Sequence, residues 1–591
     1  MNNPTRIFDL AYRQQELYPN HNMFASKIDG GWKFTKPAEF IAQTREISKG
    51  LLALGVKPGD RVGLVCESRY EWHVIDFAIQ QIGAVVVAIY PNITDFEYQF
   101  IFNDAEIQLC IVSTKNLYER INNMFGTIYS LEYVFAINEF PDSRNWSELK
   151  EIGKDITDEY VNNLSSIVRN SDLATLIYTS GTTGKPKGVM LSHNNLVSNF
   201  IAAKEIVVLE EGTRGLTFLP PCHTYERTVI YTYLYIGVTV YFAEGFEKIG
   251  DNINEVKPHI MTAVPRVMEK VYEKILKTGS ALTGKKRKVF DWAIEIASQY
   301  EPDEKKRSLV YNVKLALARK LVLNKFYEAL GGNFKYIISG SASLQGKIAR
   351  VFMAAGLPFF EGYGMTETSP LITVNNPHKL GVRIGTVGSP IKDVKVKLAE
   401  DGEILVQGPN VMMGYYKNQK VTDEVIIDGW LHTGDIGVWE EGEGHFLKII
   451  DRKKEMFKTS GGKYVVPQLI ETKLVESNFI EQAMVVGDAQ KFASAFIVPN
   501  YVNLKEWAKE NAPEISNLSR DEFIASTEVH KVINQEVRKA NQLFGNWEQI
   551  KKPAILTHEF TIEGEELTPT LKLKRKVILK KYQKEFEEIY K

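Results

Sequence analysis

The chain has 591 residues, of which 44% are hydrophobic and 25% charged, and its formal net charge is −1. This length exceeds what one compact core usually supports, so we expect at least two domains. The near-zero charge excludes a general attraction to nucleic acid, so any anion binding must be local. Three widely spaced cysteines, Cys66, Cys110 and Cys222, exclude a disulfide framework and a cysteine metal cluster, which is typical of a reducing cytoplasm.

No segment is predicted to span a membrane or to serve as a signal peptide. The first fifteen residues lack an apolar run of signal-peptide length. The longest uncharged stretch, Thr228 to Ala243, has 16 residues, whereas a spanning helix needs about 20. We expect it to form a buried helix, a turn at Gly237 and a buried strand.

The order of apolar runs predicts an α/β fold with largely parallel sheets. Continuous apolar runs at Val62–Cys66 and Gly83–Tyr90 are typical of strands buried on both faces. Further strands are expected at Thr175–Tyr178, Tyr336–Ser339 and Val394–Leu398, with helices between them.

Two changes in composition divide the chain. Residues 268–330 form a helical, basic insertion, with 14 Lys/Arg against 7 Asp/Glu between Lys270 and Ala329. A glycine-rich β segment follows over residues 381–444. We therefore expect an N-terminal domain over residues 1–450, a hinge at 451–454 and a C-terminal domain over 455–591.

A phosphate-binding loop is predicted between Tyr178 and Gly188. An apolar strand leads into a run of glycines, hydroxyls and lysines: Thr179, Ser180, Gly181, Thr182, Thr183, Gly184, Lys185 and Lys187. Glycines let the backbone approach a phosphate, and amide, hydroxyl and lysine groups bind its oxygens. Lys185 is followed by Pro186, so the loop does not match the Walker A pattern. An ordinary Gly/Thr-rich turn is the alternative.

This loop resembles the signature of the acyl-adenylate-forming enzymes, which include acyl-CoA synthetases, luciferase and peptide-synthetase adenylation domains. Five further segments resemble the family in the expected order: Gly340–Ala342, Glu361–Glu367, His432–Asp435, Asp451–Arg452 and Thr568–Lys572. The resemblance covers residues 25 to 580. It implies a large N-terminal domain of layered sheets and helices with a small β-barrel-like subdomain, followed by a small, mobile C-terminal α+β domain.

The resemblance also assigns roles to residues. Attack of a carboxylate on the α-phosphate of ATP brings two anions together, so cationic groups and Mg²⁺ are needed. Glu367 is the expected Mg²⁺ ligand, assisted by Ser180 or Thr183, and Thr366 donates to the α-phosphate. The adenosine is expected to contact Gly340, Ser341, Ala342, Glu361, Gly362, Tyr363, Gly364, Asp435 and Arg452. Without the other motifs, Asp435 would be interpreted as a turn residue.

Lys572 is the predicted catalytic lysine, at the position of the family's lysine near the C-terminus. The common family form has glycine before this lysine, whereas this chain has Leu571. Lys574 is therefore kept as the alternative, and a solvated basic helix start as the non-catalytic one. By the same resemblance Lys454 is the pivot of the hinge, and Ser460, Gly461 and Gly462 border the channel for coenzyme A.

The acid and its acceptor are predicted from the remaining features. The segment Cys222–Arg227 and the helical insertion resemble long-chain fatty acyl-CoA synthetases. His223 is expected to line the carboxylate entrance, and the run Thr228–Ala243 to wall an acyl tunnel or simply to pack in the core. A thiol nucleophile at Cys222 is disfavoured because adjacent side chains usually diverge.

The predicted reaction joins a fatty acid to coenzyme A with ATP and Mg²⁺. A fatty acyl-AMP ligase that uses a carrier protein, and a ligase for another apolar acid, remain open. A non-catalytic nucleotide-binding protein is disfavoured by the intact Lys187, Glu367 and Lys572, and nothing marks luciferase-type oxygen chemistry.

The basic insertion also predicts weak peripheral contact with an anionic membrane, centred on Lys285–Lys288. Each Lys or Arg near such a surface contributes about 1 kcal/mol. Solvated charge with no partner is the alternative. We expect a cytoplasmic protein, peripheral at most to the inner face of a membrane.

Overall fold

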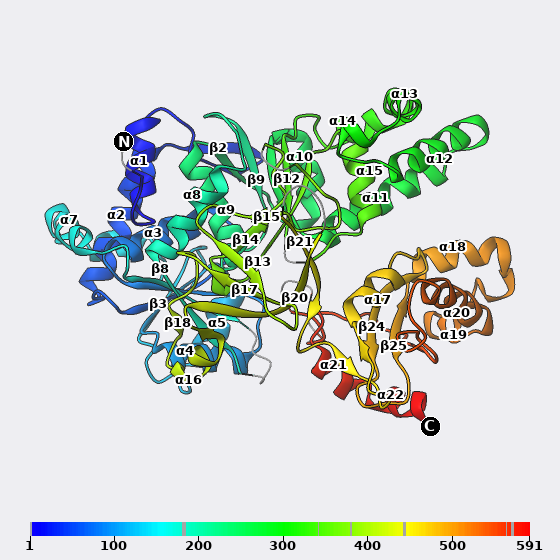
Figure 1. Cartoon of the computed structure of the whole chain (residues 1–591). Helices are drawn as coiled ribbons and strands as arrows, with labels where there is room; N and C mark the ends of the chain where they lie inside the picture. The colour runs from blue at the N-terminus through cyan, green and yellow to red at the C-terminus, as the bar shows by residue number, and fades with distance from the viewer. Residues whose placement is uncertain are drawn as a thin grey trace. The chain divides into compact units, whose positions relative to one another are not determined.

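The computed structural model describes residues 3–179, 185–340, 342–378, 381–440, 445–562, 564–568 and 572–591. The chain divides into two compact units. Unit 1 comprises residues 1–397, 405–432 and 440–447, and unit 2 comprises residues 398–404, 433–439 and 448–591. The predicted fold class, α/β with a large N-terminal and a small C-terminal domain, is confirmed (Figure 1).

Unit 1 is built on two sheets. The nine-stranded sheet has the order β15 (Ser389–Pro390), β14 (Leu371–Val374), β13 (Phe359–Gly364), β12 (Tyr336–Ser339), β11 (Ile260–Ala263), β9 (Arg214–Thr217), β10 (Thr239–Phe242), β1 (Phe24–Ile28) and β2 (Gly31–Thr35). The seven-stranded sheet has the order β18 (Gly414–Tyr415), β8 (Lys187–Ser192), β7 (Leu173–Thr179), β4 (Val85–Ile89), β3 (Arg61–Val65), β5 (Leu109–Val112) and β6 (Tyr133–Ala136). Parallel pairing from β9 through β13, and among β3 to β7, confirms the predicted layout.

Helices separate these strands along the chain. They are α1 (Asp9–Leu17), α2 (Pro37–Ala53), α3 (Tyr70–Gln81), α4 (Asp95–Ala105), α5 (Lys115–Asn122), α6 (Glu148–Ile152), α7 (Asp158–Ile167), α8 (His193–Lys204), α9 (Thr224–Ile236) and α10 (Ile249–Val256). Side chains that cap the first turn determine where several of these helices begin. Thr94 and Glu97, for example, exchange side-chain and backbone hydrogen bonds as a capping box at α4.

The run Thr228–Ala243 has the predicted form. It continues α9, ends that helix at Gly237 with φ 95°, and returns as β10. A side chain at position 237 would be strained by this φ, and its Cβ would lie 2.9 Å from the Tyr18 ring. Eleven of the thirteen α9 residues are buried, so most of this helix is core.

The basic insertion is helical, as predicted. It contains α11 (Pro265–Ser280), α12 (Gly284–Ser298), α13 (Leu309–Ala318), a π-helical turn at Arg319–Leu323 and α14 (Asn324–Ala329). Helix α15 (Gly346–Ala354) packs against α11 and α12, and these green helices lie together in Figure 1. Buried side chains of the insertion, including Leu315, Ala318 and Leu323, share one hydrophobic core.

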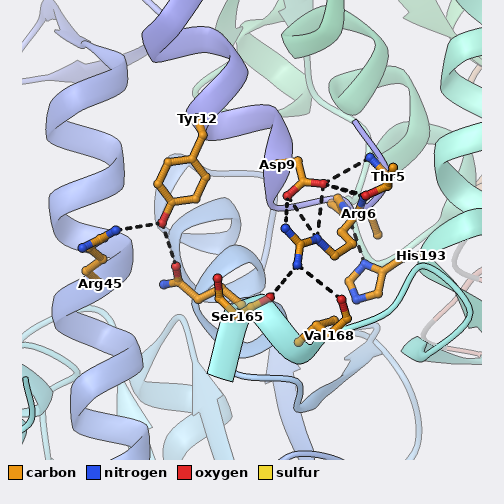
Figure 2. Close-up of polar contacts among 10 residues, drawn as sticks. Thr5, Arg6, Asp9, Tyr12, Arg45, Ser165, Val168 and His193 are labelled. Carbon is orange, nitrogen blue, oxygen red and sulfur yellow. Dashed lines mark hydrogen bonds and ion pairs between the residues drawn. The ribbon is translucent and has the colours of Figure 1, made fainter. Parts of the chain in front are cut away.

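The N-terminal segment is fastened to unit 1 by polar contacts (Figure 2). Asp9 accepts hydrogen bonds from Thr5 and Arg6. The Arg6 guanidinium also donates to the backbone carbonyls of Ser165 and Val168, at the C-terminal end of helix α7 (Asp158–Ile167). These bonds fix the start of α1 in the fold.

The β segment after residue 381 forms a five-stranded sheet. Its order is β16 (Lys395–Leu398), β17 (Glu403–Gln407), β20 (Trp430–Glu440) and β19 (Ile426–Ile427), with β21 (Phe446–Arg452) on β20. A short helix, α16 (Gln419–Val425), interrupts the segment; its start is capped by Asn418, a detail that the glycine pattern did not predict.

The rest of unit 2 is a small α+β fold. Its strands are β22 (Phe457–Lys458), β23 (Tyr464–Val465), β24 (Ile480–Val486), β25 (Ser494–Pro499) and β26 (Ala554–Ile555). Its helices are α17 (Pro467–Leu474), α18 (Tyr501–Asn511), α19 (Arg520–Ile524), α20 (Thr527–Asn541), α21 (Arg575–Lys581) and α22 (Gln583–Tyr590). Two hydrophobic clusters lie on either side of the β24–β25 hairpin, one with Ile497 and one with Phe496.

Candidate functional site

In unit 1 the predicted site residues gather at the carboxyl ends of parallel strands. Strands β12 and β13 are parallel neighbours. Gly340 therefore lies beside the segment Glu361–Gly364, at the sheet edge where α/β proteins commonly bind ligands. A Cβ at Gly364 would lie 1.9 Å from the carbonyl oxygen of Pro370, so no other residue fits there.

Helix α9 carries His223 toward the same edge. His223 is the N-cap of α9, and its Nδ1 accepts a hydrogen bond of 3.1 Å from the Tyr225 amide. Tyr225 donates to the Ile338 carbonyl at 2.9 Å, and a Cβ at Gly340 would lie 3.2 Å from its ring. The start of α9 is thereby packed against the Gly340 turn.

A second contact joins α9 to the turn that follows β13. The Thr224 and Thr366 hydroxyl oxygens lie 3.4 Å apart, and both side chains are buried. Glu367, next along the chain, is also buried, and its Oε1 accepts a hydrogen bond of 2.8 Å from the Tyr415 hydroxyl. Sequence reasoning missed Tyr415, which stands on β18 in no recognised motif.

Tyr415 also connects Glu367 to the predicted phosphate loop. Strand β18 pairs with β8, and Lys187 Nζ lies 5.1 Å from the centre of the Tyr415 ring. Thr179 and Lys187 are cross-strand partners at the ends of β7 and β8. The loop residues between them, Ser180 to Gly184, lie outside the described residues, as does Ser341, while Lys185 is exposed.

Glu361 has an unusual environment. Its side chain is buried on β13, and Oε1 accepts a hydrogen bond of 3.2 Å from the Leu344 amide. Burial raises the pKa of this carboxyl to about 7, although hydrogen bonds from the backbone of Leu344 and Gly385 lower it. Glu361 thus fastens the segment after Gly340 to β13, and Ala342 in that segment is exposed.

In unit 2 the predicted ribose residues form an ion pair. Asp435 is buried on β20, and its Oδ1 lies 3.4 Å from Arg452 Nε. Lys453, the residue after Arg452, contacts the carboxylates of Asp401 and Glu403 at 2.5 and 2.9 Å, which ties the end of β21 to the start of β17. A carboxylate next to a half-exposed arginine suits recognition of hydroxyl groups.

The predicted hinge contains one buried acid and one exposed lysine. Asp451 is fully buried and accepts hydrogen bonds from the Arg452 and Gln468 amides. Burial raises its pKa to about 6. Lys454 is exposed. The segment Ser460–Gly462 forms a tight turn, in which the Gly462 amide donates to the Thr459 carbonyl.

The segment with the predicted catalytic lysine is held on both sides. The Thr568 amide donates a hydrogen bond of 2.8 Å to the Lys572 carbonyl, and Leu567 and Leu573 form an isolated β-bridge. Lys574 is the N-cap of α21, and its amide donates to the Glu566 carbonyl. The intervening residues 569–571 lie outside the described residues.

Arg575, which sequence reasoning did not single out, anchors this segment. Its guanidinium binds both carboxylate oxygens of Glu471 at 2.8 and 2.6 Å, and Glu455 at 3.0 Å. Such two-pronged pairs fix geometry as well as adding energy. Lys572 is therefore three residues from a rigid anchor on α17.

The structure gives no support for a thiol nucleophile at Cys222, which the sequence already disfavours. Cys222 is fully buried and burial raises its thiol pKa, which makes it a poor nucleophile. Among the described residues no cluster of three His, Cys, Asp or Glu side chains forms a metal site. Within that same part of the chain, no helix is long and apolar enough to span a bilayer.

Comparison with known proteins adds family evidence to this geometry. Residues 12–416 match the AMP-binding enzyme model, and residues 455–591 match the model of the AMP-binding enzyme C-terminal domain. The chain is 35% identical to long-chain-fatty-acid–CoA ligase FadD15 of Mycobacterium bovis, covering 98% of this chain and 96% of that protein. It is 31% identical to long chain acyl-CoA synthetase 4 of Arabidopsis thaliana, covering 99% and 91%.

The fold is also found in solved structures. The o-succinylbenzoate coenzyme A synthetase of Bacillus subtilis, in complex with ATP and magnesium ion, superposes with a TM-score of 0.68 at 20% identity, covering 96% of this chain and 98% of that one. Similarity at this level concerns the fold alone. The two family matches and the nearly full-length relatives establish that this chain belongs to the AMP-binding enzyme family.

Proposed function

We propose that the chain is a long-chain fatty acid–CoA ligase. ATP and a fatty acid form an acyl-adenylate and release pyrophosphate, and coenzyme A then displaces AMP to give acyl-CoA. The observation that carries the proposal is the 35% identity to a long-chain-fatty-acid–CoA ligase over 98% of the chain. The convergence of Thr366, Glu367 and Lys187 in unit 1 supports it.

The phosphate end of ATP is assigned to unit 1. Lys187 and Lys185 supply positive charge beside the loop 179–187, and Thr366 donates to the α-phosphate. Together they offset the repulsion between the incoming carboxylate and the phosphates. Tyr415 orients Glu367 through the 2.8 Å hydrogen bond.

Glu367 suits a magnesium ion. Mg²⁺ usually takes one or two protein carboxylates and completes its shell with water and substrate phosphates. A buried carboxylate that accepts one hydrogen bond keeps further acceptor positions, because its two oxygens offer about four. When bound, the ion neutralises phosphate charge; Ser180 stays a proposed second ligand.

The adenosine contacts are proposed from the family resemblance. In unit 1, Gly340–Ala342 and Glu361–Gly364, with Tyr363, contact the adenine. In unit 2, Asp435 accepts hydrogen bonds from the ribose hydroxyls, and Arg452 orients that carboxylate from 3.4 Å.

Two steps of the reaction need different groups. Lys572 stabilises the charge that develops as the acid attacks the α-phosphate. Coenzyme A must later reach the same carbonyl carbon, so we propose that residues 451–454 act as a hinge, with Lys454 as pivot and Ser460–Gly462 at the pantetheine channel. His223 lies at the carboxylate entrance.

The proposal is tested by AMP formation from acids of two to twenty carbons, with and without coenzyme A. A long-chain fatty acid–CoA ligase consumes long acids best and needs coenzyme A for turnover. AMP formation that depends on a carrier protein instead would identify a fatty acyl-AMP ligase. No pyrophosphate release with any acid would contradict the proposal.

A further inference from the structure

Helix α13 has an uncovered apolar face. Leu309, Val313 and Leu317 recur every four residues, which places them on one side of α13, and Leu321 follows at the same spacing in the π-helical turn. All four are exposed, Leu309 to 84% and Val313 to 71%, and Val310 beside them is exposed to 66%. The opposite side of the helix is already buried in the core of the insertion. The helix is therefore apolar toward both the protein and the solvent.

Cations surround this apolar face. Residues 305–325 contain seven Lys or Arg and not one Asp or Glu. Lys314, Lys320 and Lys325 are exposed along the same helical stretch. A helix with exposed aliphatic side chains and flanking lysines is typical of segments that lie in the interface of an anionic membrane.

A basic cavity opens beside the helix. Its volume is about 390 Å³, and its polar lining comes from Arg307, Asn312, Arg319, Lys320 and Asn324. The Arg307 side chain is only 7% exposed, and its Nη2 pairs with Glu304 at 2.8 Å. Its Nε is a buried donor without a hydrogen-bond partner. A buried, unsatisfied guanidinium N–H favours an anionic oxygen ligand such as a phosphate.

We propose that α13 is a docking surface for an anionic lipid bilayer. The side chains of Leu309, Val313 and Leu317 enter the interfacial region, and a lipid phosphate binds in the cavity beside Arg307 and Lys320. The inference rests on the proposed function in one respect: a long-chain fatty acid dissolves in the bilayer, so docking brings the enzyme to its substrate.

Two other occupants fit the face less well. A second copy paired about a twofold axis would set seven cations against seven cations, which opposes association. Protein interfaces are usually anchored by Trp, Tyr and Arg, whereas the exposed residues on this face are leucine and valine. An anionic lipid surface attracts the lysines and accepts the aliphatic side chains, so it matches this face in charge and in apolar character.

Vesicle co-sedimentation of the full-length protein tests the inference. We expect at least tenfold stronger binding to phosphatidylcholine vesicles with 30% phosphatidylglycerol than to pure phosphatidylcholine, weakened by salt. Leu309→Asp/Val313→Asp should lower binding at least tenfold, whereas Ile167→Asp, a comparably exposed residue on α7, should not.

Two triple variants locate the charge. Lys314→Gln/Lys320→Gln/Lys325→Gln should lower binding at least tenfold. The matched variant Lys285→Gln/Lys286→Gln/Lys288→Gln, which removes three lysines from the start of α12, should lower it less than threefold. The reverse ranking would overturn the assignment to α13.

Further outcomes separate this inference from the proposed function. If Leu309→Asp/Val313→Asp binds vesicles like the wild type, or if it instead dissociates a wild-type dimer measured by light scattering, membrane docking through α13 is wrong. Octanoate adenylation without vesicles should be equal in all variants, which also reports correct folding. If the wild type does not adenylate any fatty acid, the proposed ligase function is wrong, whereas the inference of membrane docking is judged by vesicle binding alone.

Discussion

Arg227 in unit 1 and Arg575 in unit 2 both hold a site segment, but in different surroundings. Arg227 is fully buried; it pairs with the equally buried Asp76 and donates to Thr175, on the strand that leads into the phosphate loop. Arg575 is 18% exposed and binds Glu471 and Glu455 beside the Lys572 segment. Without Arg227, the Asp76 carboxylate would be left fully buried and without a counter-charge. Without Arg575, the carboxylates of Glu455 and Glu471 would remain partly exposed to water.

The difference indicates two ways of positioning reactive groups. In unit 1, α3, β7 and α9 meet at one buried network that also includes Tyr231. Such a network is stable only when complete, because each member is costly to leave unpaired. In unit 2 the Arg575 side chain is 18% exposed, so its ion pairs with Glu471 and Glu455 lie nearer to solvent than the pair between Arg227 and Asp76.

Removal of Arg227 should have the largest effect on stability. Arg227→Met leaves Asp76 buried without a counter-charge, which typically costs about 3–5 kcal/mol of unfolding free energy. Denaturant unfolding followed by fluorescence measures it. Arg287→Met, which breaks an exposed pair with Asp291, is the matched control and should cost less than about 1 kcal/mol. Similar losses in both variants would contradict the distinction between buried and exposed pairs.

Glu226 gives a pH-dependent test of the same region. It is fully buried, and its carboxylate accepts from the Thr217 and Thr262 hydroxyls. Burial raises the pKa of this carboxyl from its ordinary value of 4.5 to about 7. The folded protein therefore binds this proton more tightly, so the associated stability is present at low pH and lost as pH rises through about 7.

Wild-type stability should accordingly fall by about 2 kcal/mol relative to Glu226→Gln between about pH 5 and pH 8. The measurement is the unfolding free energy of both proteins across that range. If the unfolding free energies of the two proteins depend on pH in the same way, the pKa of Glu226 is ordinary, and the prediction is wrong.

Removal of Arg575 should have a smaller effect on stability than removal of Arg227. Arg575→Met loses hydrogen bonds to charged groups that water partly replaces, which costs about 1–2 kcal/mol. It should also slow adenylation more than stability alone explains, because the Lys572 segment loses its anchor. Arg575→Lys restores charge but not the two-pronged contact to Glu471, so it should recover stability better than rate. Full recovery of rate would argue against a positioning role.

The sequence predicted the architecture well where the pattern was local. The run of valines at β4, the helix–turn–strand around Gly237 and the helical insertion all have the expected form. Partners that depend on distant segments were not predictable. Tyr415 reaches Glu367 only because β18 pairs with β8, and Arg575 reaches Glu471 only through the folding of unit 2.

The site residues themselves were identified through motifs, and their roles stay predictions. The apolar face of α13 is a separate case. The sequence shows the leucines and lysines, but helix periodicity alone cannot tell which apolar side chains face the core. The structure buries Leu315 and Leu323 and leaves Leu309 and Val313 exposed.

The central claim is that Lys572 serves adenylation and not transfer, and half-reaction kinetics test it most directly. Lys572→Ala should slow pyrophosphate release with palmitate about 10²–10³-fold, or ~3–4 kcal/mol, and spare acyl-CoA formation from synthetic acyl-adenylate. Lys454→Pro, which fixes φ near about −65° in the proposed hinge, should do the reverse. Equal slowing of both half-reactions by Lys572→Ala, or a selective adenylation defect in Lys574→Ala instead, would contradict the account.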